Sequence, residues 1–133
     1  MVAVGDELFA VEFPVRRQDL VAYAEASGDH NPIHLDDDAA RAAGLPGVIA
    51  HGMFTMGLAA RAIADWAGGP DRVTEFSARF AKPVPVPPEG TAVTVSATVR
   101  NLRDDATAEL AVTVTCGTDR VLAPSRAVVA VPD

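Results

Sequence analysis

Residues 27–38, SGDHNPIHLDDD, place acids, two histidines, an asparagine and a proline in one short stretch. On a helix, the five-residue spacing of Asp29 and His34 would put them on different faces. Pro32 disfavours helical geometry at Asn31, so the segment is predicted to be extended or turn-like. Both side chains can then point into one cleft, where a carboxylate and an imidazole form an acid–base pair. Asn31 adds a donor and an acceptor that can fix the loop or a ligand carbonyl.

Other interpretations of this stretch stay open. Gly-Asp and Asn-Pro are common turn dipeptides, and Asp and Asn side chains often bond to their own backbone, so the stretch also fits a structural turn. The triple acid at residues 36–38 is typical of a solvated helix start. His30 and His34 have the H-x-x-x-H spacing that binds zinc on a helix. Pro32 lies between them and no cysteine ligand accompanies them, so we expect no metal.

A second candidate stretch is AHGMFTMG, residues 50–57. Gly52 falls at the predicted start of a buried helix, where backbone N–H groups lack intrahelical partners and the helix dipole is positive. A glycine there lets a ligand oxygen approach the amide, which makes an oxyanion hole for a carbonyl whose α-carbon loses or gains a proton. Alternatively, Gly52 only permits a tight entry from loop to helix, and His51 caps that helix.

Three helices are predicted to position these residues. RQDLVAYAEASG, residues 17–28, predicts a helix that ends at Gly28. LDDDAARAAG, residues 35–44, predicts a short helix with its acids at the N-terminal end and Gly44 as its stop. The longest candidate runs from about residue 52 to 67, and it is apolar or small nearly all round, which predicts a buried helix.

The second half of the chain changes to the alternation that is typical of strands. Helices followed by an antiparallel run of strands predict an α+β fold, in which an antiparallel β-sheet wraps around one long central helix. A proline-rich connector, PVPVPPEG, is expected at the edge or rim of the sheet. The predicted strands are 75–84, 91–99, 108–116 and 126–131, after an extended lead at 7–13, with turns at 103–105 and 117–120.

Length and composition bound the remaining possibilities. A chain of 133 residues fits one domain, residues 1–133, and has neither an apolar run long enough to span a membrane nor a signal-peptide pattern. Cys116 is the single cysteine, which indicates a reducing compartment, so we expect a cytoplasmic protein. The net charge of −7 and the single lysine argue against a nucleic-acid partner. We expect no membrane partner either.

The segment Tyr23–Ala40, YAEASGDHNPIHLDDDAA, resembles the hydratase-2 signature of MaoC-like hotdog proteins, Y-x-x-x-S-G-D-x-N-P-I-H-x-D-x-x-x-A. AGLPGVIAHGMFTMGLAARAI and VTEFSARFAKPVPVP are similar to the loop, central helix and following strand of that family, so the likeness covers roughly residues 3–131. The resemblance implies a hotdog fold that dimerises into a larger sheet. It also implies a hydro-lyase that reversibly dehydrates (3R)-3-hydroxyacyl thioesters of CoA or acyl carrier protein by syn elimination, in fatty-acid or polyketide-type metabolism.

Carried over to this sequence, the resemblance implies that Asp29 and His34 are catalytic, without settling which of them handles which proton. Asn31, His51 and Gly52 are expected to bind the substrate or its oxyanion, and no cofactor is expected. Position 30, in a variable slot of the motif, is His, which can perturb the protonation of the neighbouring pair.

The resemblance is closest to the catalytic subunit of mycobacterial-type (3R)-hydroxyacyl-ACP dehydratases, which pairs with a non-catalytic hotdog subunit. Homodimeric (R)-specific enoyl-CoA hydratases share the motif, so a homodimer and a heterodimer are both open. A hotdog acyl-thioesterase and a non-catalytic acyl-binding partner subunit are the alternatives. The complete motif weighs against the first, and the intact Asp29/His34 pair weighs against the second.

Overall fold

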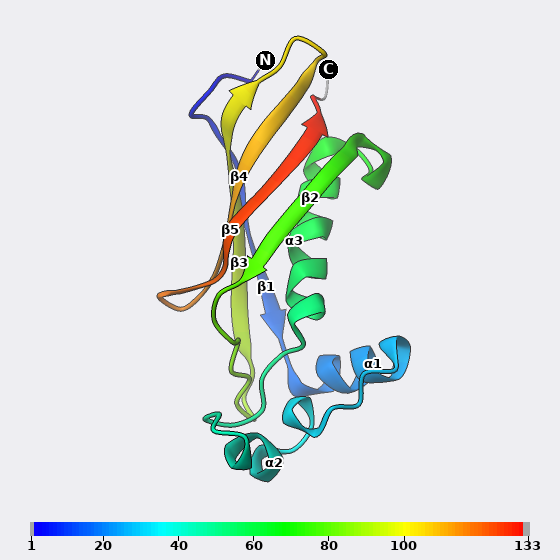
Figure 1. Ribbon diagram of the computed structural model, residues 1–133, viewed down its shortest axis with the longest axis vertical. Helices are drawn as coiled ribbons and strands as arrows, with labels where there is room; N and C mark the ends of the chain where they lie inside the picture. The colour runs from blue at the N-terminus through cyan, green and yellow to red at the C-terminus, as the bar shows by residue number, and fades with distance from the viewer. Residues whose placement is uncertain (1, 132–133) are drawn as a thin grey trace.

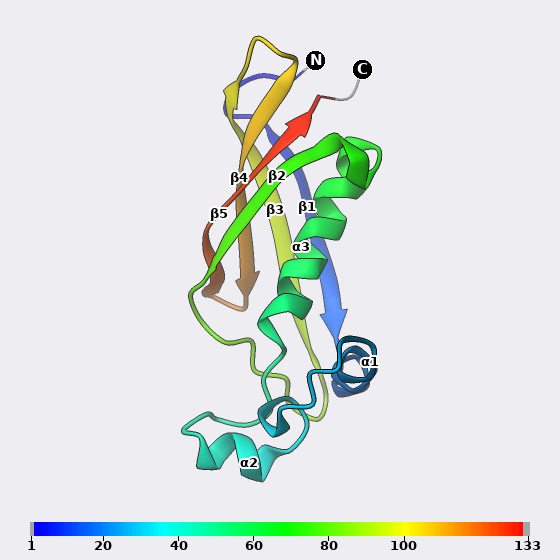
Figure 2. The ribbon, with the colours of Figure 1, turned by 45° about the vertical axis from the view of Figure 1, so that its right-hand side comes forward.

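The computed structural model describes residues 2–131, and it contains one antiparallel sheet of five strands in the order β1-β3-β4-β5-β2. The sheet curves around helix α3, while α1 and α2 lie beyond one end of it, near the start of α3 (Figures 1 and 2). The elements in chain order are β1 (Glu7–Val15), α1 (Arg17–Ser27), the 3₁₀ turn η1 (Pro32–His34), α2 (Asp37–Ala42), α3 (Gly52–Ala67), the 3₁₀ turn η2 (Pro70–Arg72), β2 (Val73–Phe80), β3 (Thr91–Leu102), β4 (Thr107–Cys116) and β5 (Asp119–Ala130).

Alternation along β3 and β4 builds the floor of the core. Every second residue is buried from Val93 to Val99 in β3 and from Ala108 to Val114 in β4. The two strands pair so that Val95 lies opposite Val114 and Val99 opposite Leu110. Each buried Val or Leu side chain contributes about 1.5–3 kcal/mol relative to an exposed one. The buried residues on the two strands are Val93, Val95, Ala97, Val99, Ala108, Leu110, Val112 and Val114.

Helix α3 has the predicted bounds, Gly52–Ala67, but it is not buried all round. One stripe, which includes Thr55, Ala59 and Ile63, packs inside. Its outer face carries the exposed ion pair Arg61–Asp65, with 3.8 Å between Nε and Oδ2. Near-complete burial was therefore a wrong expectation, because the sheet covers the helix from one side only.

The proline-rich connector forms no regular strand, as expected, and it pairs with the loop that leads into α3. The Ala50 N–H donates to the Val84 carbonyl and the Val86 N–H to the Val48 carbonyl, each at 2.9 Å. Strand β2 accordingly ends at Phe80, before the predicted end at residue 84. These two hydrogen bonds fix the chain immediately before the start of α3.

Strand β5 begins at Asp119, whereas the prediction placed a turn at 117–120 and the strand from 126. Pro124 disfavours a strand assignment from sequence, because proline cannot donate to a sheet ladder. The sheet accommodates it through an irregular register between β4 and β5, at Ala111 and Val114. Within residues 2–131, no helix is long and apolar enough to cross a membrane.

Candidate active site

Helix α1 ends where the motif begins. Gly28 has φ +79°, a left-handed conformation that glycine adopts without strain, and its N–H donates to the Ala24 carbonyl at 2.9 Å. The next residues form a turn: Ser27 Oγ accepts from the Asp29 N–H at 3.1 Å, and Asp29 Oδ1 accepts from the Asn31 N–H at 3.2 Å. The structural-turn interpretation is therefore correct, and it still leaves the second carboxylate oxygen of Asp29 free of these turn contacts.

The proline shapes the path from Asp29 to His34. Asn31 has ψ 124°, the extended geometry that a following proline favours, and its Oδ1 accepts from the Ile33 N–H at 3.2 Å. Pro32 opens the single 3₁₀ turn η1 that ends at His34. The Asn31 side chain is exposed and caps this turn, so in this structure it fixes the loop.

His34 is 8% exposed, and its Nδ1 lies 2.7 Å from the carbonyl oxygen of Ile49. A carbonyl oxygen only accepts hydrogen bonds, so this contact assigns the proton to Nδ1. In the neutral ring Nε2 then carries the lone pair and is available as a base. The partner residue belongs to the loop before α3, so the ring is fixed relative to that helix.

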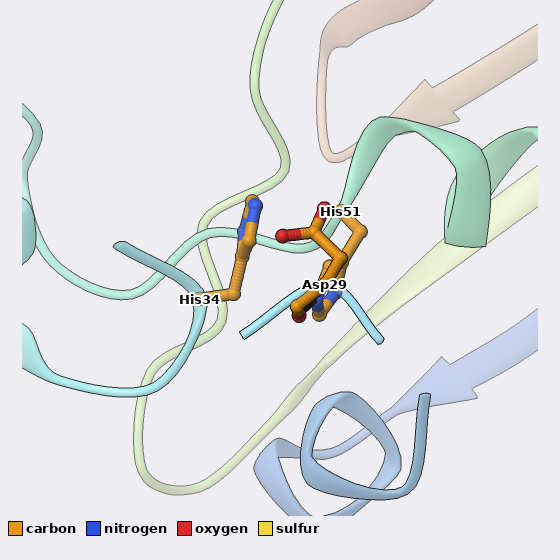
Figure 3. A group of neighbouring side chains, drawn as sticks. All are labelled: Asp29, His34 and His51. Carbon is orange, nitrogen blue, oxygen red and sulfur yellow. Dashed lines mark hydrogen bonds between the residues drawn. The ribbon is translucent and has the colours of Figure 1, made fainter. Parts of the chain in front are cut away.

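Asp29, His34 and His51 converge, although His51 is far from the other two in sequence. One polar atom from each side chain lies within 4.8 Å of those of the other two. Figure 3 shows the Asp29 carboxylate turned toward the His34 ring. Asp29 is exposed, whereas both histidines are buried. The structure thus brings together the two residues that the sequence predicts as an acid–base pair.

His51 is 2% exposed and sits between aromatic neighbours. Its ring stacks on that of His34 with centroids 3.9 Å apart and an interplanar angle of 25°, and Tyr23 lies 4.7 Å away in a tilted arrangement. His51 occupies the N-cap position of α3, but its side chain makes no capping hydrogen bond. Instead its Nε2 lies 3.0 Å from the backbone oxygen of Asp29.

Because that oxygen accepts, His51 Nε2 carries the proton and Nδ1 the lone pair. Nδ1 is buried and has no hydrogen-bond partner within residues 2–131. Burial lowers the pKa of His51 below 6.5, and the nearby His34 lowers it further, against opposing contributions from Asp29. The ring is therefore neutral at pH 7.

A cavity of about 300 Å³ opens beside His34 and the start of α3. This volume is at the lower end of the range for small-molecule sites. The walls are mainly apolar, with few polar side chains among them. The wall residues include His34, Gly52, Thr55, Phe80, Lys82 and Leu122.

Gly52 is the first residue of α3, and its N–H has no intrahelical partner because of that position. A Cβ at this residue would lie 3.0 Å from Cε1 of Phe80. Phe80 is 54% exposed, so its ring has room to shift. The geometry is compatible with both roles considered for Gly52, close approach of a ligand to the amide and tight packing.

The site is poorly arranged for zinc. Nδ1 of His34 and Nε2 of His51 already lie at hydrogen-bonding distance from backbone carbonyls. His30, the other half of the H-x-x-x-H spacing, is exposed and contacts Glu25 at 3.4 Å. Acid–base chemistry fits this arrangement better than metal binding.

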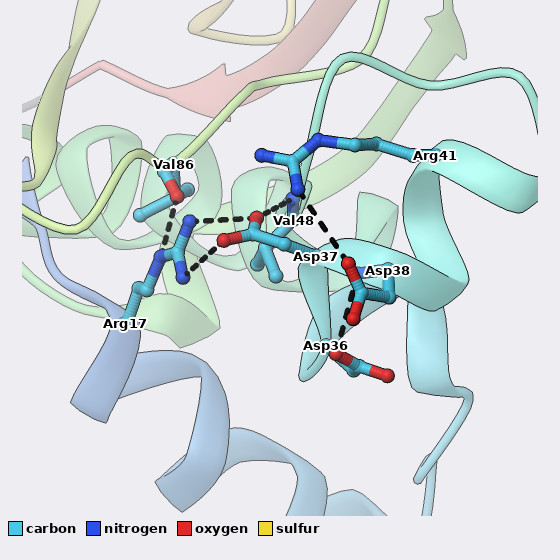
Figure 4. A network of polar contacts seen from close by, with 7 residues as sticks. All are labelled: Arg17, Asp36, Asp37, Asp38, Arg41, Val48 and Val86. Atoms are coloured by element: carbon cyan, nitrogen blue, oxygen red, sulfur yellow. Dashed lines mark hydrogen bonds and ion pairs between the residues drawn. The ribbon is translucent and has the colours of Figure 1, made fainter.

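The three acids at 36–38 have different roles. Asp36 caps α2 by accepting from the Asp38 N–H at 3.2 Å, as a helix start does. Asp37 accepts two hydrogen bonds from Arg17, at 2.8 and 3.0 Å, and one from the Val48 N–H at 2.9 Å (Figure 4). These hydrogen bonds, that of Arg17 above all, lower the pKa of Asp37. The solvated-start prediction was therefore wrong for Asp37.

Arg17 also donates from Nε to the Val86 carbonyl at 2.9 Å. This one side chain thus connects α1, α2 and the proline-rich connector (Figure 4). Sequence reasoning missed this role of Arg17, and it missed Thr55, Phe80 and Lys82 as cavity walls. For Thr55 a signal existed, because residues 52 and 55 are one helical turn apart on the same face.

The sequence profile of the MaoC-like domain family matches residues 2–118. The 3-hydroxyacyl-thioester dehydratase X of Mycobacterium tuberculosis is 54% identical over 66 residues, which are 49% of this chain and 22% of that protein. A solved structure described as a MaoC-like dehydratase superposes with a TM-score of 0.95 at 37% identity, covering 98% of this chain and 41% of that one.

The (R)-hydratase from A. caviae involved in PHA biosynthesis superposes with a TM-score of 0.85 at 28% identity, over 98% of both chains. These similarities confirm the α+β hotdog fold. The chain spans under half the length of dehydratase X and of the MaoC-like dehydratase, and nearly all of the A. caviae hydratase.

Proposed function

This chain belongs to the MaoC-like domain family, and from that premise we propose that it is a hydro-lyase that interconverts (3R)-3-hydroxyacyl and trans-2-enoyl thioesters. The relatives described as a dehydratase and an (R)-hydratase support this choice of reaction. The observation that carries it is the convergence of the Asp29 carboxylate and the His34 imidazole near the cavity at the start of α3. The reaction needs an acid–base pair of this kind and no redox group.

In the dehydration direction, Nε2 of His34 takes the proton from C2 of the substrate. The C–H electrons move onto the thioester oxygen as an enolate, which the Gly52 N–H at the positive end of α3 stabilises. The enolate then collapses to the C2=C3 double bond while the C3–O bond breaks. In a syn elimination, the proton now on His34 lies on the same face of the substrate as the departing C3 hydroxyl group. The hydroxyl oxygen takes this proton from His34 and leaves as water.

The Asp29 carboxylate binds the departing or incoming water in this proposal. Its negative charge also stabilises the imidazolium that His34 becomes after it takes the proton. The loss of one carboxylate or one imidazole therefore removes a group that acts at the transition state and has little part in ground-state binding.

Substitution of Asp29 and His34 tests their proposed roles. With crotonyl-CoA as substrate, hydration by the wild-type protein should decrease the absorbance of the conjugated enoyl thioester. Asp29→Asn and His34→Ala should each lower kcat by roughly 10²–10⁴-fold with the fold retained, the usual range for a general acid–base group. Steady-state rates with circular dichroism of each variant check this.

The matched control is Asp38→Asn, because Asp38 is exposed and does not belong to the cluster of Asp29, His34 and His51. Near-wild-type rates in both Asp29→Asn and His34→Ala would exclude the assigned roles. Release of free thiol, measured with a thiol reagent, in place of hydration would indicate an acyl-thioesterase. No turnover at any acyl length or carrier, alone or with a second hotdog subunit, would exclude the hydro-lyase.

We also propose that residues 1–133 form a single domain that acts in the cytoplasm and pairs with another hotdog subunit, either a second copy or a different chain. The free edges of β1 and β2, together with exposed Met53 and Phe80 near the site, support pairing. The single cysteine supports a reducing compartment. The thioester carrier is CoA or acyl carrier protein.

A further inference from the structure

Asp29 needs a contact outside its own loop to lie in a fixed position against His34. The side-chain hydrogen bonds of residues 27–33 join residues only two positions apart, so they shape the turn without placing Asp29 in the protein. At the far end of the turn, the Ile33 carbonyl accepts from the Ile49 N–H at 3.2 Å, which fixes the His34 side of the segment. One hydrogen bond reaches Asp29 from a distant segment: His51 Nε2 donates to its backbone oxygen at 3.0 Å across 22 residues. That bond connects the loop to the N-cap residue of α3.

His51 also supports the second member of the pair. The His51 ring stacks on the His34 ring with centroids 3.9 Å apart, and the Tyr23 ring of α1 lies 4.7 Å from the His51 ring, centroid to centroid. Phe54 of α3 packs edge-on against Tyr23 with centroids 5.6 Å apart. With 2% of its surface exposed, the His51 ring has almost no area left for a ligand, and it is not among the cavity walls. It therefore acts through its neighbours.

We propose that His51 is a positioning residue, which holds the Asp29 backbone with Nε2–H and supports the His34 ring by stacking, so that carboxylate and imidazole face the same substrate carbons. This inference rests on the proposed hydro-lyase function. It replaces the expectation that His51 contacts the substrate directly. A displacement of about 1 Å in a catalytic group can cost roughly a hundredfold in rate, so one hydrogen bond of this kind is functionally significant.

Two substitutions separate the donor from the ring. His51→Gln keeps an amide N–H at a reach similar to that of Nε2 but loses the ring, and His51→Phe keeps a ring that can stack but has no donor. We expect His51→Phe to lower kcat for crotonyl-CoA by roughly a hundredfold with KM changed less than about threefold. His51→Gln should retain kcat within about tenfold of wild type. Equal losses in the two variants would overturn the role of the donor.

A double-mutant cycle tests whether His51 acts through Asp29. In an Asp29→Asn background the carboxylate is already lost, so adding His51→Phe should cost far less than its loss in the wild type. Independent roles would instead give a multiplied loss in the double variant, and that outcome would overturn the proposal.

Amide hydrogen exchange supplies a readout that does not need turnover. His51→Phe should raise exchange at residues 28–31, whereas His51→Gln and the control Asp38→Asn should leave it near wild type. Unchanged exchange in His51→Phe would overturn the proposed anchoring even if the enzyme is active. A wild-type protein without turnover but with this exchange pattern would exclude the hydro-lyase and keep the anchoring.

Discussion

At the scale of single residues, the backbone assigns different tautomers to two adjacent histidine rings. The Ile49 carbonyl accepts from Nδ1 of His34, and the Asp29 carbonyl accepts from Nε2 of His51. His34 thereby presents an unprotonated Nε2 as the proposed base, whereas the free nitrogen of His51 is buried. The same side chain can thus serve as a base or as an anchor, depending on which ring nitrogen the backbone occupies.

Burial of neutral His51 has a consequence for stability against pH. Because burial lowers its pKa from 6.5, the unfolded chain binds more protons at this residue than the folded chain does. Stability should therefore be highest above pH 6.5 and decrease as the pH falls from 6.5 toward the folded-state pKa. The charge of a protonated His34 lowers the pKa of His51 further, whereas Asp29 raises it.

Urea unfolding from about pH 8 to about pH 5 measures this contribution. The wild type should lose stability across that interval, and His51→Phe should lose less, because its residue 51 does not titrate. His30→Gln, at an exposed position, should follow the wild type. An identical pH dependence in wild type and His51→Phe would contradict the prediction.

At the scale of elements, the site is the meeting point of α1, η1, the start of α3 and the proline-rich connector. Local signals end α1 at Gly28 and start α3 at Gly52. Arg17 then joins α1 to Asp37 of α2 and to Val86 of the connector. Since the guanidinium is planar and makes two parallel bonds to the carboxylate, it fixes orientation as well as distance.

Helix α3 offers a matched pair of glycines. In the single chain a Cβ at Gly57 would meet nothing within 4 Å, so Gly57→Ala should favour helix α3 by about 1 kcal/mol. Gly52→Ala should lower activity, because its Cβ would crowd the Phe80 ring and the approach to the amide. Thermal unfolding and crotonyl-CoA rates measure both effects.

Gly52→Ala combined with Phe80→Ala distinguishes the two roles considered for Gly52. If the glycine only provides space for the Phe80 ring, the double variant should recover the rate lost in Gly52→Ala. If ligand approach to the amide matters, the rate should stay low, and we expect this result. Full recovery would remove Gly52 from the proposed oxyanion hole.

At the scale of the whole molecule, the open outer side of α3 is the main departure from the predicted fold. Small and apolar residues dominate the helix, yet Met53 and Arg61 are exposed in the single chain. Strands β1 and β2 also leave free edges. The edge of a sheet presents unpaired N–H and C=O groups, on which a strand of another chain can pair.

The active species should therefore contain two hotdog chains. Light scattering on the purified, active protein should give twice 13.8 kDa for a homodimer. For a heterodimer, this chain should become active only when it is co-purified with a second chain. Full activity in a species of 13.8 kDa would contradict the proposed pairing.

The sequence by itself determined the features that local geometry controls. Glycine at a left-handed position ends α1 at residue 28, and proline bends the following segment, so the approach of Asp29 to His34 was predictable. The start of α3 at residue 52 was also predictable. Alternation in β3 and β4 likewise determined the buried face of the sheet.

The tertiary structure alone decided the contacts between distant segments. The bond from His51 to the Asp29 carbonyl, the pairing of Arg17 with Asp37, and the extension of β5 back to Asp119 depend on how the chain folds back on itself. A short-range pattern specifies the φ and ψ preferences of neighbouring residues and the face on which each side chain lies. It does not specify which distant carbonyl or carboxylate arrives there, and the catalytic geometry depends on those partners.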